Sequence, residues 1–506
     1  MINEKRATAN QARTYDWSMI GSSPPPRWLR RDSAAVGALL VAALATRLWY
    51  FWLPPVVVFD EKYTVAQARN YLAGLPFKNT HPPFSSILMA LSMEFLGDNA
   101  VGWRLPSALF GTALVGITYL LGRRICGSRI AAGLSASFAI CDGLFIVDSR
   151  IALWEIFYLT FAACAYLALF TFMQSRSKSV QRQALAWMGF ALGLCLASKL
   201  LIPAVTFALV MVFVFGALLS ESCTSPRTQP LAKPRVCVLI LNLASALALV
   251  GGLSALVCFA VFLPDYWLGW WRGVGDQLAY YHQEFRAQIQ LPSDGHPYAS
   301  RWWSWPLMLR SILYWSGDRF FANPDASVLA IRALGNPVIW WGVVVSVPLA
   351  ALKAIARRDV AIAFIVVGYT GYLAMWLPIS RYQFVYYYMP SLYLGFFALA
   401  STVVECARGE PGSWEPVALL APVISVSVLG VGAPYGLGTA AALAGVYLGL
   451  RYHSPRHAGM FVSIVFVATV LALFVYFFPV WTGAPLSPTG FRQRMWLHGP
   501  GLANWI

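Results

Sequence analysis

The chain has few charged residues for its length. Of its 506 residues only 11% are charged, while 58% are hydrophobic. A soluble domain carries about 25% charged residues, so this chain lacks the polar surface that a soluble protein of its size needs. That scarcity excludes a soluble globular fold and predicts a polytopic membrane protein, in which lipid contacts most of the surface.

Other absences narrow the classes of partner and site. The eight cysteines are scattered and form no CxxC pair, so we expect buried thiols that pack as small hydrophobic groups. The net charge is +16, but the basic residues lie in short loops between apolar runs, which argues against a nucleic-acid partner. His81, His282 and His296 show no paired spacing, so neither a divalent cation nor any other metal is supported.

Apolar runs dominate what is present. A spanning helix needs about 20 mainly apolar residues, and by that measure the chain has roughly 13 candidates. The short segment 84–97 carries Glu94 and is expected to lie along the membrane surface. The predicted spans are 34–53, 100–121, 130–147, 156–173, 184–198, 200–220, 237–263, 337–352, 360–377, 382–403, 416–432, 437–450 and 459–479.

Basic residues predict the orientation in a cell membrane. Most lysines and arginines fall in the tail 1–33 and in short connections on the same side, which the positive-inside rule places in the cytoplasm. The integral membrane domain is then 34–480, with two long outer loops, 54–99 and 264–335, and an outer-face tail, 481–506. Outer loops of this length are expected to form the functional face.

An acidic pair stands where the first apolar run leaves the membrane. Asp60 and Glu61 follow Pro54-Pro55 and three valines, and an amphipathic run comes next, "YTVAQARNYLAGL". A carboxylate at the lipid–water boundary suits an enzyme that joins a lipid-linked donor to a polar acceptor from outside. There it would act as general base for a hydroxyl nucleophile.

Eight sequence blocks, taken in order, resemble the bacterial protein O-mannosyltransferase family. Together they extend from residue 59 almost to the end of the chain. The blocks are "FDE…HPPF", "WRLPSALFGTALV", "GRRICGS", "DGLFIVDSRIALWE", "ASKL", "HPYASRWWSWPLMLR", "SRYQFVYYYMPS" and "FFPVWTG…FRQRMWL".

The resemblance implies a fold, an activity and site residues. The implied fold is the all-α GT-C glycosyltransferase architecture, with short amphipathic helices in the outer loops. The implied activity moves mannose from a polyprenyl-phosphate donor to Ser or Thr of exported proteins, with inversion at the sugar carbon. Carried over by motif, Asp60 matches the catalytic aspartate, Glu61 its acidic neighbour, His81 the HPP motif and Arg104 the arginine of the second span. The protein-export machinery is a further expected partner.

The remaining site candidates come from the charge pattern. Arg104, Arg150 and Arg381 stand at predicted outer ends of spans, where a lipid phosphate would lie. Asp148, Arg150 and Glu155 are close enough in one short loop to pair with each other, and the family usually has Asp at the position of Glu155. His296, among tryptophans, is expected to contact sugar or lipid. Lys199, alone at a span boundary, either neutralises phosphate or snorkels.

Two other functions fit the same composition. One is a lipid-linked-sugar transferase with a lipid or glycan acceptor, similar to the aminoarabinose transferases. The other is a transporter of lipid-linked sugar, although here the charges gather on one face and no inverted repeat is visible. The absence of GxGxxG and P-loop patterns fits a donor that is not a nucleotide sugar.

Overall fold

A computed structural model of the protein describes residues 27–76, 81–224, 233–290, 296–317, 327–409, 414–497 and Trp505. Most of the expected cytoplasmic tail 1–33 therefore lies outside the described residues, as do short parts of both outer loops and of the C-terminal tail. The described chain is predominantly helical and its buried residues form one continuous hydrophobic core.

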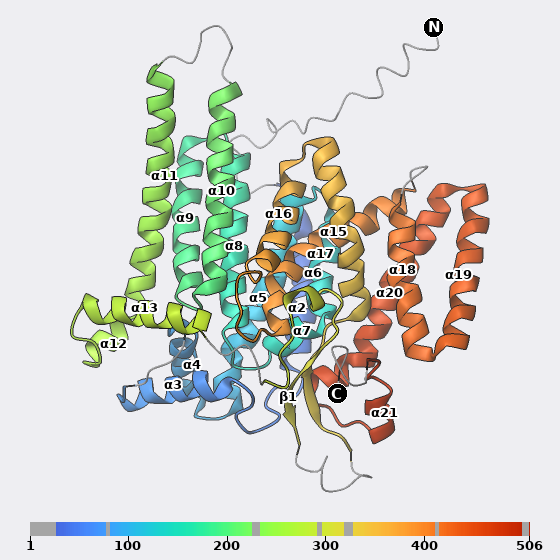
Figure 1. Ribbon diagram of the computed structural model, residues 1–506, viewed down its shortest axis with the longest axis horizontal. Helices are drawn as coiled ribbons and strands as arrows, with labels where there is room; N and C mark the ends of the chain where they lie inside the picture. Colours follow the sequence, from blue (N-terminus) through green and yellow to red (C-terminus); the bar gives the residue numbers. More distant parts are fainter. Residues whose placement is uncertain are drawn as a thin grey trace.

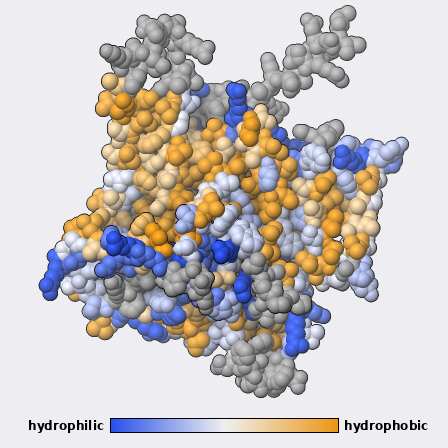
Figure 2. Space-filling model, in the orientation of Figure 1, coloured by the Kyte–Doolittle hydropathy of each residue, from blue (hydrophilic) through white to orange (hydrophobic). Residues whose placement is uncertain are grey.

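Long helices run side by side through the molecule (Figure 1). Their bounds are α2 (Arg27–Leu48), α5 (Ala100–Ile125), α6 (Arg129–Cys141), α8 (Glu155–Gln174), α9 (Lys178–Leu196), α10 (Leu201–Thr224), α11 (Lys233–Ala260), α15 (Pro337–Arg357), α16 (Val360–Ala374), α17 (Met389–Arg408), α18 (Glu415–Val431), α19 (Ala433–His453) and α20 (Pro455–Thr482). Hydrophobic residues cover α10 and α11 in the space-filling view (Figure 2), as expected for helices that face lipid.

Seven helices in the described residues are long and apolar enough to cross a membrane. They are α5, α8, α10, α11, α15, α17 and α20, and each corresponds to a predicted span. The other predicted spans correspond to helices that are shorter or less apolar. The multi-pass membrane class is therefore confirmed, whereas the predicted total of about 13 spans is not.

One predicted span is interrupted by a polar side chain. The run 130–147 forms two helices, α6 and the short α7 (Gly143–Asp148), which meet at Asp142. The Asp142 carboxylate accepts hydrogen bonds from the amides of Leu144 and Phe145 and so caps α7. Its second oxygen accepts from the indole of Trp340 at 2.7 Å, which ties this junction to α15. Apolar composition alone does not reveal this capping interaction.

Short elements gather across one end of the bundle, at the bottom of Figure 1. They include α3 (Glu61–Ala73), α4 (Phe84–Leu96), α12 (Leu263–Trp267), α13 (Val274–Gln290), the 3₁₀ turns η2 (Trp302–Ser304) and η3 (Val385–Tyr388), and α21 (Pro488–Arg492). An antiparallel pair of strands, β1 (Ile312–Ser316) and β2 (Ala330–Ala333), adds a small β element to the predicted all-α architecture. We call this end the loop end.

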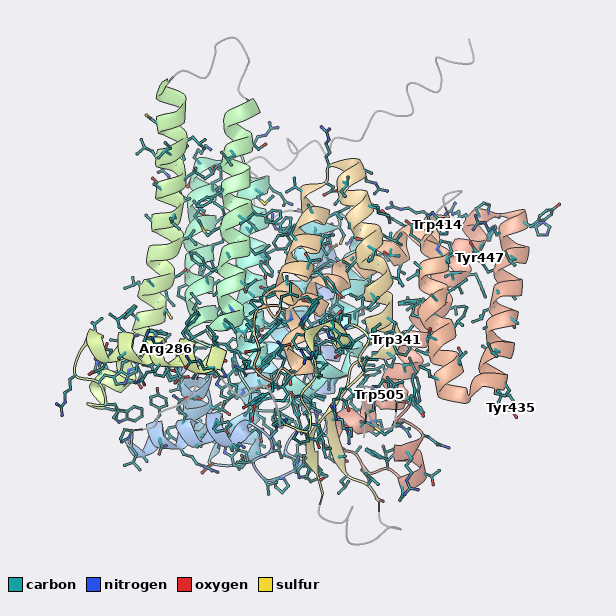
Figure 3. All side chains as sticks on the ribbon, in the orientation of Figure 1. Arg286, Trp341, Trp414, Tyr435, Tyr447 and Trp505 are labelled. Carbon is teal, nitrogen blue, oxygen red and sulfur yellow. The ribbon has the colours of Figure 1, made fainter. Side chains whose placement is uncertain are left out.

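The two ends of the bundle differ in their polar contacts. At the loop end Trp505, labelled in Figure 3, donates from its indole to the carbonyl of Met308 at 2.7 Å. At the opposite end, which we call the far end, Lys353 pairs with Glu405 and Glu415. Exposed Trp414 and Tyr435 mark the two ends of the α18–α19 hairpin (Figure 3), the positions that aromatic side chains favour at membrane interfaces.

Candidate active site

Asp60 stands at the start of α3, at the loop end. Phe59 before it has φ of 47°, a left-handed conformation that is uncommon for a bulky residue. The Phe59 ring is stacked on Tyr314 of β1 with 4.1 Å between ring centroids. This stacking holds the strained turn, and backbone strain of this kind is concentrated at functional sites.

Burial makes the Asp60 carboxylate more basic than an ordinary one. Burial raises its pKa to about 6, and the negative charge of Glu155 adds to the shift, while Lys62 and Lys199 oppose it. Asp60 is therefore mostly ionised at neutral pH, yet it holds a proton more strongly than a solvated carboxylate. A general base works best with a pKa near the working pH, so Asp60 has the properties of one.

Glu61 and Arg104 form a buried ion pair beside Asp60. Arg104 Nε donates to Glu61 Oε1 at 2.7 Å, Arg104 Nη2 donates to Oε2 at 2.9 Å, and both side chains are at most 1% exposed. Arg104 also donates to the carbonyls of Pro54 and Val56. Glu61 accepts from the amide of Ala152 at 2.9 Å. The pair thus joins α3, α5, the loop before Asp60 and the loop before α8.

Lys199 and Glu155 form a second buried pair, at the start of α8. Lys199 Nζ lies in an ion pair with Glu155 Oε1, and both side chains are almost fully buried. The ammonium faces the rings of Trp154, Tyr158, Tyr386 and Tyr387, with 5.2 Å to the nearest centroid, that of Tyr387. Lys199 is therefore a desolvated cation whose charge also acts on Asp60.

His81 lies against the same aromatic group. Its ring meets Trp154 edge to face at 4.5 Å, and its Nδ1 is 3.4 Å from the side-chain nitrogen of Gln288 on α13. Burial, together with Lys199 and Arg381, lowers the pKa of His81 well below its usual value, so the imidazole is neutral. The HPP segment thus packs over the site without adding a charge to it.

Arg381 connects α13 to the aromatic segment before α17. Its Nη1 donates to Gln288 Oε1 at 2.7 Å and to the Gln288 carbonyl at 3.0 Å, while Nη2 donates to the Tyr387 hydroxyl at 2.7 Å. The side chain is only 6% exposed. These contacts hold the end of α13 beside His81.

Asp148, Arg150 and Glu155 do not pair with each other. Asp148 accepts a hydrogen bond from the Tyr314 hydroxyl at 3.0 Å, and Glu155 is paired with Lys199. Arg150 donates to the carbonyls of Arg47 and Trp49 at the end of α2. Each of the three side chains thus contacts a different element, because the fold supplies closer partners than the loop itself.

His296 lies at the edge of this group. Its ring is 4.8 Å from that of Phe384 and 5.7 Å from that of Tyr382. The tryptophans around it do not form one surface, because Trp305 is 1% exposed in the core and Trp303 is 44% exposed. Burial and the charge of Lys62 lower the pKa of His296.

Of the nine site residues selected from the sequence, five surround one polar centre: Asp60, His81, Asp148, Glu155 and Arg381. Glu61 and Arg104 form the buried ion pair that holds the adjoining elements together, Arg150 binds the end of α2, and His296 is at the edge of the group. Sequence analysis left Lys199 open between binding phosphate and snorkelling, and it did not select Tyr314, Tyr386 or Gln288, although the aromatic run "FVYYY" was a visible signal. In the described chain no three His, Cys, Asp or Glu side chains gather as metal ligands would.

Solved structures share this fold over most of the chain. The protein O-mannosyltransferase Pmt1–Pmt2 complex of S. cerevisiae, bound to the sugar donor, matches 93% of this chain and 92% of its own chain, with a TM-score of 0.73 and 14% identity. ArnT from Cupriavidus metallidurans bound to undecaprenyl phosphate matches 91% of this chain and 78% of its own, with a TM-score of 0.53 and 15% identity. These matches confirm the predicted GT-C fold.

Relatives in sequence match nearly the whole chain and carry the same activity in their names. The polyprenol-phosphate-mannose–protein mannosyltransferase of Mycolicibacterium smegmatis is 26% identical over 94% of this chain and 95% of its own length. The protein of that name from Mycobacterium tuberculosis is 25% identical over 87% of this chain and 86% of its own length. The family model for dolichyl-phosphate-mannose-protein mannosyltransferase matches residues 37–270, and the model for the C-terminal four-span region of protein O-mannosyltransferase matches 276–499. With its two halves matched in order by the two models, the chain belongs to the protein O-mannosyltransferase family.

Proposed function

We propose that this protein transfers a mannosyl residue from polyprenyl-phosphate mannose to Ser or Thr hydroxyls of exported proteins, with inversion at the sugar carbon. The activity in the names of relatives that match this chain over most of their length supports the reaction class. The observation that carries the proposal is the presence, at one end of the bundle, of a basic carboxylate and a desolvated cation whose charge acts on it. Asp60 and Lys199 supply these two groups.

In the proposed reaction Asp60 acts on the acceptor and Lys199 on the leaving group. The acceptor hydroxyl gives its proton to Asp60 as its oxygen forms a bond to the sugar carbon. The bond from that carbon to the phosphate oxygen breaks, and the lipid phosphate leaves with the electron pair. Because the leaving group is anionic, a cation near it lowers the barrier. Lys199 is the candidate for this role, since its charge acts on Asp60 and Glu155 is the one ion-pair partner found for it among the described residues. Arg104 is held by two backbone carbonyls and both Glu61 oxygens, and Arg150 is held by backbone carbonyls of α2.

A purified sample tests the function directly. We expect protein in liposomes, incubated with polyprenyl-phosphate mannose and a Ser/Thr peptide, to add one hexose to the peptide by mass. Asp60→Asn serves as the inactive control. Hexose found only on an added lipid or glycan would instead support the alternative acceptor class, which the ArnT fold match keeps open. A transporter would move the lipid-linked sugar across the bilayer and leave the peptide mass unchanged.

Lys199 is predicted to act on the donor phosphate. Lys199→Met should lower the transfer rate roughly ten- to a hundredfold, the effect of losing about 1.5–3 kcal/mol from a charge-assisted contact. The initial rate is measured in the same liposomes. Because the substitution also leaves Glu155 unpaired, the double variant Lys199→Met/Glu155→Gln is the control. If the double variant regains wild-type rate, Lys199 serves only to neutralise Glu155.

The protein-export machinery stays a predicted partner.

We further propose that the loop end faces outward from the cell membrane, with the N-terminus in the cytoplasm. Two single cysteines test the orientation in a background lacking the exposed Cys237. Gly275→Cys, on α13, replaces a glycine whose added Cβ would meet no atom within 4 Å. We expect an impermeant thiol reagent to label it in intact cells but not Ser177→Cys at the far end. The reverse pattern would invert the topology.

A further inference from the structure

An apolar groove opens at the far end, remote from Asp60. It has a volume of about 730 Å³ and lies between α6, α17 and α20. Its wall is mostly aliphatic and includes Ile130, which is 68% exposed, and Ile464, which is 61% exposed. The groove therefore opens sideways, toward the space that lipid occupies around a membrane protein.

Close contact between α17 and α20 forms the floor of the groove. A Cβ added to Gly459 would come within 1.9 Å of the Cys406 carbonyl oxygen, so only glycine allows this approach. The hydroxyl of Ser463 donates to the carbonyl of Val403 at 3.0 Å. Small residues thus bring the two backbones together, as is common between membrane helices. The groove is built into the packing of the core helices.

Two arginines lie at the mouth of the groove. Arg408 ends α17 and Arg456 begins α20, and both side chains line the groove and are exposed. No carboxylate or carbonyl partner is found for either among the described residues. The nearby Lys353 and Arg357, by contrast, are both paired with Glu405. The groove therefore combines an apolar body with two uncompensated positive charges at one end.

The length of the groove matches one leaflet. The lining of α20 extends from Arg456 to Leu471, which is about 22 Å along the helix axis at roughly 1.5 Å of rise per residue. Half of a bilayer with its head groups is also roughly 20–22 Å thick. A two-chain phospholipid fits this depth with its phosphate at the arginines, whereas the chain of a long polyprenol would extend beyond it.

We propose that this groove binds an anionic phospholipid of the leaflet at the far end, the cytoplasmic leaflet in the orientation proposed above. Acyl chains lie along Ile464 and Leu471, and the phosphate accepts hydrogen bonds from Arg408 and Arg456. Arginine is suited to bidentate contact with phosphate. The site is separate from the catalytic loop end, and it does not depend on which sugar or acceptor the enzyme uses.

Photocrosslinking tests this site. Purified protein is placed in phosphatidylcholine liposomes that contain a minor fraction of phosphatidylglycerol with a photoactivatable acyl chain, and crosslinked peptides are mapped by mass. We expect crosslinks on 460–471 and 403–408, and roughly tenfold less crosslinking in Arg408→Gln/Arg456→Gln. The matched control, Arg176→Gln/Arg182→Gln, removes two exposed arginines at the same end but outside the groove, and should crosslink like wild type.

A second variant keeps the charges and changes only the shape. Ala468→Trp should narrow the exposed groove, and we expect it to lower crosslinking as the arginine variant does. Three results would overturn the proposal. They are equal crosslinking by a photoactivatable phosphatidylcholine, crosslinks between two protein copies in place of lipid, and displacement of the probe by a polyprenyl phosphate but not by unlabelled phosphatidylglycerol.

Discussion

Asp60→Asn is expected to lower the rate of mannosyl transfer by about 10²–10⁴-fold, the range that general-base catalysis supplies, with little change in donor affinity. Asparagine keeps the size and polarity of the side chain but cannot take the proton of the acceptor hydroxyl. Initial rates and donor binding are measured in the same liposomes. Normal turnover in this variant would remove Asp60 from the chemistry.

The pH profile gives an independent measurement on the same residue. The base must be ionised, and burial has raised the pKa of Asp60 to about 6. The rate of the wild-type enzyme should therefore fall as the pH drops through about 6, and the residual activity of Asp60→Asn should lack this acidic limb. An acidic limb centred near the usual pKa of a solvated carboxylate would contradict the raised pKa of the half-buried Asp60.

Stability should change in the opposite direction to activity in Asp60→Asn. The pKa of Asp60 is higher in the folded state than its ordinary value. The folded protein therefore binds the proton more strongly than the unfolded chain, and stability declines as the pH rises from the unfolded to the folded pKa. At neutral pH the ionised Asp60 thus destabilises the fold. The melting temperature of Asp60→Asn should be no lower than that of wild type, which separates lost chemistry from lost folding.

Glu61→Gln is expected to destabilise the protein rather than remove a catalytic group. The substitution leaves the Arg104 guanidinium buried, at 1% exposure, without its anionic partner. Breaking a buried pair from one side costs about 3–5 kcal/mol in free energy of unfolding. The measurement is the loss of folded protein on heating in detergent. The double variant Glu61→Gln/Arg104→Met should recover much of the loss, because no uncompensated charge remains.

An exposed ion pair provides the matched control. Arg69 and Asp98 are 45% and 47% exposed, so Arg69→Met should cost at most about 1 kcal/mol. If Glu61→Gln keeps a wild-type melting temperature but loses turnover, Glu61 belongs to the chemistry and the base has been assigned to the wrong carboxylate. If both Glu61→Gln and Asp60→Asn turn over normally, the proposed glycosyltransfer at this loop is wrong.

Composition and motif order were enough to predict the class of this protein. Scarce charge and long apolar runs are properties of composition, so they predict a membrane protein without any knowledge of contacts. The order of short motifs identified the family, and the position of Asp60 at the exit of the first apolar run placed a carboxylate near the membrane boundary. These features depend only on residues that are close together in the chain, so they can be recognised in the sequence without knowledge of the fold.

Which charged side chains lie around Asp60 depends on the tertiary packing. Arg104, Arg150 and Arg381 all stand at the ends of predicted spans, yet Arg104 binds Glu61, Arg150 binds carbonyls of α2 and Arg381 binds Gln288. Lys199, which looked equally suited to snorkelling, is buried among aromatic rings. The partners of these four side chains are 43, 103, 93 and 44 residues away along the chain. A buried charge needs a partner within hydrogen-bond distance, and tertiary packing decides which group that is. The spacing of residues in the sequence does not show which partner will be close.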